Sequence, residues 1–164
     1  MNRVDTVALV ACTAKKLPHA ARAGDMYMPS EWFKGAFPIA DRISEQVWIL
    51  SAKHHLLDTD EVIEPYQKTL NTMSLKKRTE WGNFTWENLC SRDEFKNATH
   101  IVWFAGLRYR EQLIHRCQSA GKINLIPMAG LRLGDQLSWL RSNRGISEEE
   151  LLDWCSCSPD RIAR

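Results

Sequence analysis

The sequence predicts an α/β fold, a three-layer sandwich with a central, mostly parallel four-stranded sheet, in a single domain over residues 1–164. Apolar, β-rich runs alternate with segments of helical periodicity, which is the pattern of βαβ units. Crossovers between such strands are almost always right-handed and give a parallel sheet with helices on both faces. A length of 164 residues suits one core, and 44% hydrophobic residues supply the surface to fill it.

Four segments are expected to form the strands of this sheet. Each is a short run enriched in β-branched, aliphatic or aromatic residues, as expected of strands buried on both faces. They are residues 4–12 (VDTVALVAC), 46–52 (QVWILSA), 100–104 (HIVWF) and 122–126 (KINLI). In such sheets ligands bind beyond the carboxyl ends of the strands, so the segments that follow each strand are the ones to inspect for function.

Five helices are expected between and after these strands. The first opens at residues 29–31 and carries apolar residues at helical spacing, with Pro38 ending or kinking it. The second covers residues 73–90, where Gly82 weakens the pattern. A third buries Leu107, Leu113, Ile114 and Cys117 and stops near Gly121, and a fourth buries Leu133, Leu137 and Leu140 before Gly145. Ser147 and Glu150 form a capping box for a last short helix.

Composition and charge exclude several classes of protein. The longest apolar run, residues 7–12, is far too short for a membrane helix, and no basic leader precedes it, so we expect a cytoplasmic protein with no membrane partner. Five cysteines without CxxC spacing favour reduced thiols, and we expect no metal and no cofactor. The net charge of +2 does not by itself indicate nucleic acid. Basic residues, however, surround one acidic segment, residues 58–64, in a pattern that suits either a phosphate backbone or solvated helix faces.

A short motif occurs twice, each time after a predicted strand. Residues 105–113 read AGLRYREQL and residues 129–137 read AGLRLGDQL. A glycine before a helix leaves backbone N–H groups free for an anion, and an arginine stands beside each one. The motif therefore indicates phosphate binding, or else two turns that need glycine for packing. No GxGxxG or P-loop pattern is present, which disfavours hydrolysis of nucleoside triphosphates.

Residues 51–66 hold the densest set of reactive side chains. Two histidines, a lysine, several carboxylates and a tyrosine follow the second strand, and apolar pairs within the segment would fold it back onto the core. A carboxylate near a cation and an aromatic ring suits cleavage of a glycosidic bond, because its charge stabilises an oxocarbenium-like transition state. An ordinary polar surface loop is the alternative.

Residues 12–16, after the first strand, place a thiol, a hydroxyl and ammonium groups toward the same crevice. Cys12 is more simply a small buried thiol than a nucleophile, for which His54 or His55 would serve as base. Tyr27, Trp32 and Trp103 are candidates for stacking on a flipped base, although core packing explains the two tryptophans better.

Several of these motifs together resemble a bacterial and phage family of small domains of unknown function, more distantly similar to the peroxide-stress protein YaaA. They are VACTAKKL, DMYMPSEWF, WILSAKHHLLDTDEVIEPYQKTL, FAGLRYREQL and PMAGLRLGDQLSWL. Against the family segment SAKxGLLxPxxxIxPYDxTL, this chain has His55 for Gly, Thr59 for Pro and Gln67 for Asp. A catalytic acid after the tyrosine would thus be missing, and Asp60 or Glu64 would have to act instead.

The resemblance implies chemistry on DNA bases. YaaA is a DNA-binding protein, and an antiviral DNA glycosylase that removes glucosylated hydroxymethylcytosine from phage DNA looks similar in size and motif. The expected sheet also matches the plan of uracil-DNA glycosylases, which is an analogy of fold alone. The expected function is therefore a DNA glycosylase that flips a modified base out of the duplex and hydrolyses its N-glycosidic bond in defence against phage. DNA with modified bases is the expected partner, and no obligate protein partner is implied.

We assign the expected roles as follows. The catalytic candidates are Asp60, with Lys53 assisting and Glu64 as substitute. The candidates for binding the base are Thr13, Lys16, Tyr27, Ser51, His54 and Tyr66. The candidates for binding phosphates or DNA are Gly106, Arg108, Tyr109, Gly130, Arg132, Gly134, Lys76, Lys77 and Arg78. The alternatives are a noncatalytic nucleotide- or DNA-binding module and a hydrolase or transferase of small nucleosides.

Overall fold

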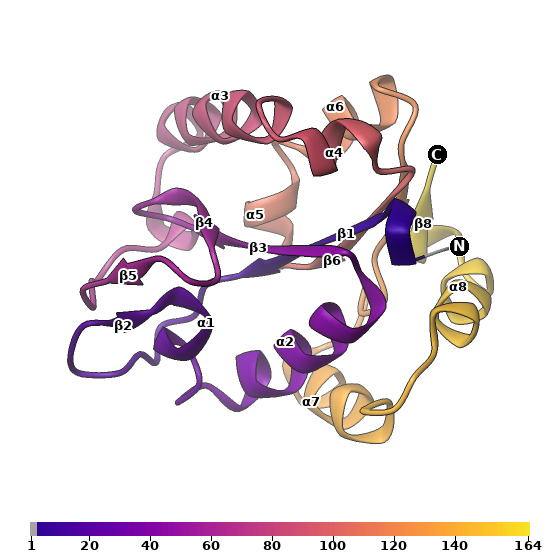
Figure 1. The fold of residues 1–164 in the computed structure, drawn as a ribbon, viewed down its shortest axis with the longest axis horizontal. Coiled ribbons are helices and arrows are strands. Elements are labelled where there is room, and N and C mark those ends of the chain that lie inside the picture. Colours follow the sequence, from indigo (N-terminus) through magenta and orange to yellow (C-terminus); the bar gives the residue numbers. More distant parts are fainter. Residues whose placement is uncertain (1–2) are drawn as a thin grey trace.

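A mixed sheet of six strands forms the centre of the molecule in a computed structural model, which describes residues 3–164 (Figure 1). Helices α3, α4 and α6 lie on one side of this sheet, and α2 and α7 lie on the other. The strand order is β4-β3-β1-β6-β7-β8. The expected α/β class with a mostly parallel sheet is confirmed, whereas the expected number of four strands is wrong.

The four predicted strands are the four parallel ones. They are β1 (Thr6–Ala11), β3 (Gln46–Ser51), β6 (His100–Phe104) and β7 (Ile123–Leu125). Two short antiparallel strands complete the edges, β4 (His55–Asp58) and β8 (Ile162–Ala163). A separate antiparallel pair is made by β2 (Ala21–Arg22) and β5 (Val62–Ile63).

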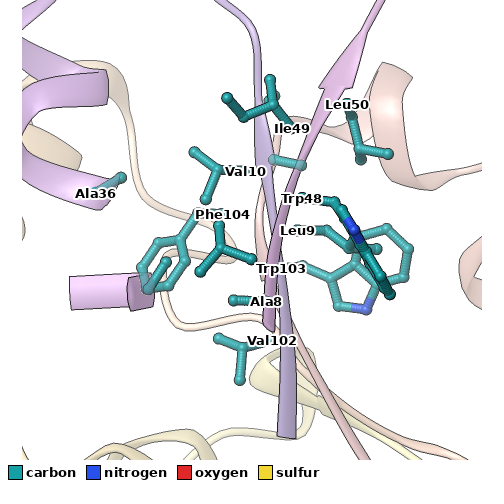
Figure 2. Close-up of a cluster of buried hydrophobic side chains, with 14 of the residues drawn as sticks. Ala8, Leu9, Val10, Ala36, Trp48, Ile49, Leu50, Val102, Trp103 and Phe104 are labelled. Carbon is teal, nitrogen blue, oxygen red and sulfur yellow. The ribbon is translucent and has the colours of Figure 1, made fainter. Parts of the chain in front are cut away.

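The core lies on both faces of β1, whose six residues are all buried. On one face Leu9 stands in register with Trp48 of β3 and Trp103 of β6 (Figure 2). On the other face Val10 points toward Ala36 of α2. Both indoles are buried, and the Trp103 Nε1–H donates to Oδ1 of Asn124 at 2.9 Å. Trp103 is therefore a core residue and is not available to stack on a base.

Eight α-helices and three short 3-10 turns are present within residues 3–164. The helices are α1 (Ala23–Met26), α2 (Glu31–Ile43), α3 (Leu75–Cys90), α4 (Asp93–Asn97), α5 (Leu107–Arg110), α6 (Ile114–Ser119), α7 (Leu133–Ser142) and α8 (Glu148–Ser156). The 3-10 turns are η1 (Arg3–Asp5), η2 (Leu70–Thr72) and η3 (Pro159–Arg161). In this part of the chain, no helix is both long and apolar enough to cross a membrane.

The helix starts follow the polar residues that precede them. Ser30 accepts a hydrogen bond from the Phe33 N–H at the start of α2, and Ser147 and Glu150 form the expected capping box of α8. Pro38 does not end the helix, because α2 continues through it to Ile43. Pro38 is exposed, and the buried residues of the next turn hold the helix against the sheet.

The segment after β6 departs further from expectation. It forms two short helices, α5 and α6, in place of one. Leu107 at the start of α5 is 60% exposed and Leu133 at the start of α7 is 64% exposed, so the expectation that both are buried is wrong. Leu113 and Cys117 are fully buried, as expected. The apolar periodicity thus identified the inner faces of these helices but not their ends.

Candidate functional site

The principal cavity of the described chain opens where β1 and β6 end. It has a volume of about 850 Å³. The segment after β1 contributes residues 11–16, and Gly106 and Tyr109 come from the segment after β6. The start of α2, residues 67–72 and the start of α7 supply the other walls. This is the edge at which open α/β sheets bind their ligands.

Cys12 and Tyr109 form part of this cavity's wall. The Cys12 thiol donates a hydrogen bond to the Tyr109 hydroxyl at 3.4 Å, and the Leu70 backbone N–H donates to the same hydroxyl at 3.4 Å. Burial raises the pKa of Tyr109, which keeps its hydroxyl neutral. The contact joins three segments that are far apart in sequence and fixes the shape of the cavity at this point.

A chain of buried hydroxyls lies beside the cavity. The Tyr66 hydroxyl is 2.7 Å from Oγ of Ser51 and 2.8 Å from the Tyr27 hydroxyl. Burial raises the pKa of both tyrosines, so the chain is uncharged. Tyr27 is fully buried and Tyr66 nearly so, and neither lines the cavity. Their rings are packed in the core, so the placement of Tyr27 and Tyr66 gives no support to direct contact with a base.

Lys16 covers this hydroxyl chain and also lines the cavity. Its Nζ lies 4.4 Å from the centroid of the Tyr66 ring and 5.9 Å from that of Tyr27. Burial lowers the pKa of Lys16. A cation held over an aromatic ring loses little further freedom when it meets a ligand, so the tyrosines act on the site by positioning Lys16.

The cavity has more cations than carboxylates. Lys15, Lys16 and Lys68 line it, and Glu31 is the one carboxylate among its lining residues. Amide side chains supply paired donors and acceptors, and these are Gln67, Asn71 and Gln136. The walls therefore suit an anionic ligand that also carries hydrogen-bonding groups.

Trp32 and Gln136 form another part of the wall of this cavity. The Trp32 Nε1–H donates to Oε1 of Gln136 at 2.8 Å, and Nε2 of Gln136 donates to the Leu131 carbonyl at 2.8 Å. These bonds fix the orientation of the amide and hold the half-buried indole at the cavity. Trp32, for which the sequence favours core packing, is only partly buried and also lines the cavity.

Asp60 and Glu64, the expected carboxylates, do not line this cavity. The β4 strand runs back along β3, with Asp58 opposite Trp48, and so carries the following turn away from the end of β3. Asp60 forms an ion pair with Arg22, and its side chain is 80% exposed. Glu64 and Lys53 are exposed as well, with Lys53 Nζ 5.9 Å from the Tyr66 ring centroid. Catalytic roles for these three residues have no support in their placement.

Of the other three base-binding candidates, Thr13 lines the cavity, whereas Ser51 and His54 do not. Thr13 lines the cavity, and its hydroxyl donates to the Lys15 carbonyl at 3.3 Å. Ser51 is fully buried and accepts from the His54 N–H at 3.0 Å. The His54 ring packs edge-on against Tyr66 at 5.5 Å, and burial lowers its pKa. Ser51 and His54 therefore support the cavity without lining it.

The two AGLR segments meet at a smaller cavity of about 200 Å³. Gly106 and Gly130 both line it, but their turns differ, because φ is −66° at Gly106 and +77° at Gly130. Helix α5 starts directly after Gly106, whereas α7 starts three residues after Gly130. The repeated sequence therefore does not form two equivalent anion sites.

The arginines and the last glycine of this motif lie at the surface. Arg108 pairs with Glu111 at 3.5 Å, while Arg132 and Gly134 are exposed, and none of the three lines either cavity. Arg110, which follows in the first copy, does line the smaller cavity and donates to the Ala105 carbonyl at 2.7 Å.

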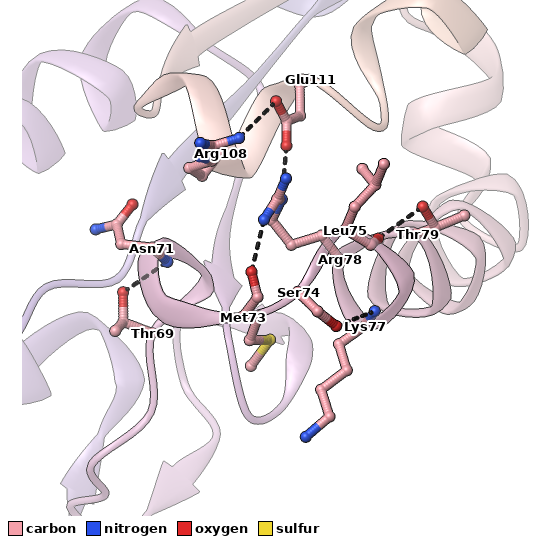
Figure 3. A network of polar contacts seen from close by, with 10 residues as sticks. All are labelled: Thr69, Asn71, Met73, Ser74, Leu75, Lys77, Arg78, Thr79, Arg108 and Glu111. Carbon is pink, nitrogen blue, oxygen red and sulfur yellow. Dashed lines mark hydrogen bonds and ion pairs between the residues drawn. The ribbon is translucent and has the colours of Figure 1, made fainter.

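The basic residues at the start of α3 play different parts (Figure 3). Arg78 is only 11% exposed; it donates to Glu111 at 2.8 Å and to the Met73 carbonyl at 2.6 Å. Its placement gives no support to a role as a DNA contact, because its guanidinium holds α3 against the α5 segment. Lys76 and Lys77 are exposed, and Lys77 extends away from this ion pair.

A family model described as "Family of unknown function (DUF6884)" matches residues 7–142. The chain belongs to this family. No curated protein and no solved structure matches it. All lining residues of the principal cavity, from Ala11 to Leu137, lie within the part that defines DUF6884. The family match brings no activity with it, and neither a YaaA-like nor a glycosylase relationship follows from it.

The DUF6884 cavity includes residues that the sequence patterns did not single out. They include Ser30, Glu31, Gln67, Lys68, Thr69, Asn71, Thr72 and Gln136, while Leu133 and Leu137 were expected only as buried helix positions. The sequence offers one pattern that points to Gln136, the glutamine that both AGLR segments share. Only the second copy of this glutamine lines the cavity, because Gln112 is not among the lining residues. Residues 67–72 have no periodic pattern and reach the site only through the tertiary fold.

Proposed function

We propose that this DUF6884 protein is a DNA glycosylase that takes one modified nucleotide into the principal cavity and hydrolyses its N-glycosidic bond. The observation that carries the proposal is the lining of that cavity, which combines lysines, amides and an indole at the carboxyl ends of parallel strands. These groups complement the phosphate, the hydrogen-bonding edge and the ring face of a nucleotide, respectively. The cavity volume is of the size that small-molecule sites have.

Glu31 replaces Asp60 as the candidate carboxylate. It is the first residue of α2 and lines the cavity, whereas Asp60 and Glu64 do not. In the proposed reaction the carboxylate stabilises the positive charge that develops on the deoxyribose and accepts a proton from the attacking water. The C1′–N bond breaks with its electrons moving to the base, and the water oxygen bonds to C1′. Lys16 lies in the same cavity and supplies positive charge to the departing base.

The test uses duplexes that carry one cytosine in unmodified, 5-hydroxymethyl or glucosylated 5-hydroxymethyl form. Each is incubated with the protein and treated with alkali, which cleaves at abasic sites, and the released base is measured by mass spectrometry. We expect release from a modified duplex and none from the unmodified one. Activity on glucosylated DNA would fit a role in cytoplasmic defence against phages that modify their genomes.

Glu31→Gln tests the assignment of the carboxylate. We expect it to slow base release roughly 100- to 10,000-fold while DNA affinity is kept. Glu45→Gln is the matched control, because it removes the same charge beyond the other end of α2, outside the cavity. Asp60→Asn and Glu64→Gln should remain active. Full activity of Glu31→Gln together with loss in Asp60→Asn would overturn the assignment.

The excess of lysines over carboxylates in the cavity favours a second candidate, a noncatalytic nucleotide- or DNA-binding module. The same experiment separates the two functions, since a binder retains the duplex and releases no base. A hydrolase or transferase of small nucleosides would instead act on free nucleosides and ignore the duplex.

A further inference from the structure

A second cavity, of about 710 Å³, adjoins the principal one. Gln67, Lys68, Thr69 and Thr72 line both cavities. The two hollows are therefore neighbours on either side of the segment that leads into α3. A ligand that fills the first cavity and continues along the surface can enter the second without leaving the protein.

Aromatic rings form one side of this second cavity. Phe84 of α3 is 53% exposed, and the His55 ring lies 4.4 Å from it, centroid to centroid. Trp81 stacks behind His55 at 6.5 Å with an interplanar angle of 19°. His55 has φ +65°, the one positive value outside glycine within residues 3–164. A strained backbone thus holds the imidazole among the two rings of α3.

Charged side chains also line the second cavity. Lys68 stands at the junction of the two cavities, and Lys77 lines the second near Ser74, the N-cap of α3 (Figure 3). Glu80 is the carboxylate among the lining residues. Burial lowers the pKa of His55, so its ring is neutral near pH 7 and adds no positive charge beside Phe84. An exposed ring with lysines on its flank is the combination that single-stranded nucleic acid uses.

We propose that the second cavity binds the nucleotide adjacent to the one in the principal cavity, with its base on Phe84 and the connecting phosphate at Lys68. This inference rests on the proposed binding of a nucleotide and extends it to a footprint of two nucleotides on one strand. Every base has a ring face, so the second subsite accepts any base and contributes affinity rather than sequence preference.

Binding of short, unmodified deoxynucleotides tests this subsite. Affinities are measured by calorimetry for a 5′-phosphorylated mononucleotide and for the corresponding dinucleotide. We expect the dinucleotide to bind more tightly. Phe84→Ala should reduce dinucleotide affinity by about 5- to 100-fold, the worth of one stacked base, and leave mononucleotide affinity unchanged. Phe84→Tyr keeps the ring and should keep the dinucleotide advantage.

Leu75→Ala is the matched control, since Leu75 is a similarly exposed apolar residue on α3 that lines neither cavity. It should leave both affinities unchanged. Lys68→Gln should weaken the dinucleotide more than the mononucleotide. Equal affinity of the two ligands for the unaltered protein, or an unchanged dinucleotide advantage in Phe84→Ala, would overturn the second subsite.

The outcome is independent of catalysis, because no bond is cleaved in these measurements. A protein that shows a Phe84-dependent dinucleotide advantage but releases no base from any duplex would refute the glycosylase and retain the second subsite. A protein that releases base while Phe84→Ala binds the dinucleotide normally would do the reverse.

Discussion

At the scale of single residues, Tyr66 contacts several side chains next to the principal cavity without lining the cavity itself. Its hydroxyl is shared between Ser51 and Tyr27, while its ring faces Lys16 and the edge of His54. The sequence identifies Tyr66 as unusual only through its place among reactive neighbours. Tyr66 does not line the cavity, but its ring lies 4.4 Å from Nζ of Lys16, which does.

Removing hydroxyls from this chain should destabilise the fold to an extent that depends on position. Tyr66→Phe leaves both Ser51 and Tyr27 without this partner, whereas Tyr27→Phe removes one contact at the end of the chain. We expect Tyr66→Phe to lower the free energy of unfolding by about 1–3 kcal/mol and Tyr27→Phe by less. Urea denaturation of the two variants measures the difference. An equal loss would mean that the hydroxyl chain does not act as a unit.

At the scale of elements, Gly82 explains the weakest point of the predicted α3 pattern. A Cβ at this position would lie 2.5 Å from Cβ of Gln112, in the segment between α5 and α6. Glycine is unfavourable within a helix, so its presence reflects the close approach of this neighbouring segment. Gly82 weakens the sequence signal for α3, and its lack of a side chain allows the segment around Gln112 to pack closely against this helix.

Alanine at two of the helical glycines, Gly82 and Gly134, should have opposite effects. Gly82→Ala gains helix propensity but must displace Gln112, so we expect a net loss of about 1–3 kcal/mol in the free energy of unfolding. Gly134→Ala meets no atom within 4 Å in α7 and should gain up to about 1 kcal/mol. Thermal and chemical unfolding of both variants checks the signs. A gain in Gly82→Ala would show that the contact with Gln112 yields easily.

The sequence predicts elements well where the signal is local. The four parallel strands are continuous apolar runs, and the capping box of α8 spans only four residues, so both are predictable. The edge strands β4 and β8 are short, and pairing with a distant strand defines them, so no periodicity marks them. The contact between Trp32 and Gln136 joins positions 104 residues apart and follows only from the complete fold.

At the scale of the whole molecule, positive charge is gathered where the cavities open. The formal net charge is only +2, yet Lys15, Lys16, Lys68 and Lys77 all line one cavity or the other. The acidic segment at residues 58–64, which holds the expected catalytic carboxylates, lines neither of these two cavities, and Asp60 is paired with Arg22. Net charge therefore conceals a local field that favours an anionic ligand.

The salt dependence of DNA binding should report which of these charges meet phosphates. Lys77→Gln should reduce the slope of log K against log salt by about 0.9 on duplex DNA, the share of one phosphate contact. Arg78→Gln is its neighbour and control: it should leave the slope unchanged but lower stability, because Arg78 is already bonded to Glu111. Equal slopes for Lys77→Gln and the unaltered protein would show that Lys77 contacts no phosphate.

The β8 strand protects one edge of the central sheet. It covers the outer edge of β7, where Asn124 pairs with Ala163 and the Ile126 N–H donates to the Arg161 carbonyl at 2.7 Å. Within residues 3–164, β8 follows every helix and every other strand in the chain, so this edge of β7 stays unpaired until β8 is made. An unpaired strand edge is a template for intermolecular association. A chain shortened to end before Ile162 would therefore keep the residues that line both cavities but expose the outer edge of β7, and we expect it to associate more readily than the full chain.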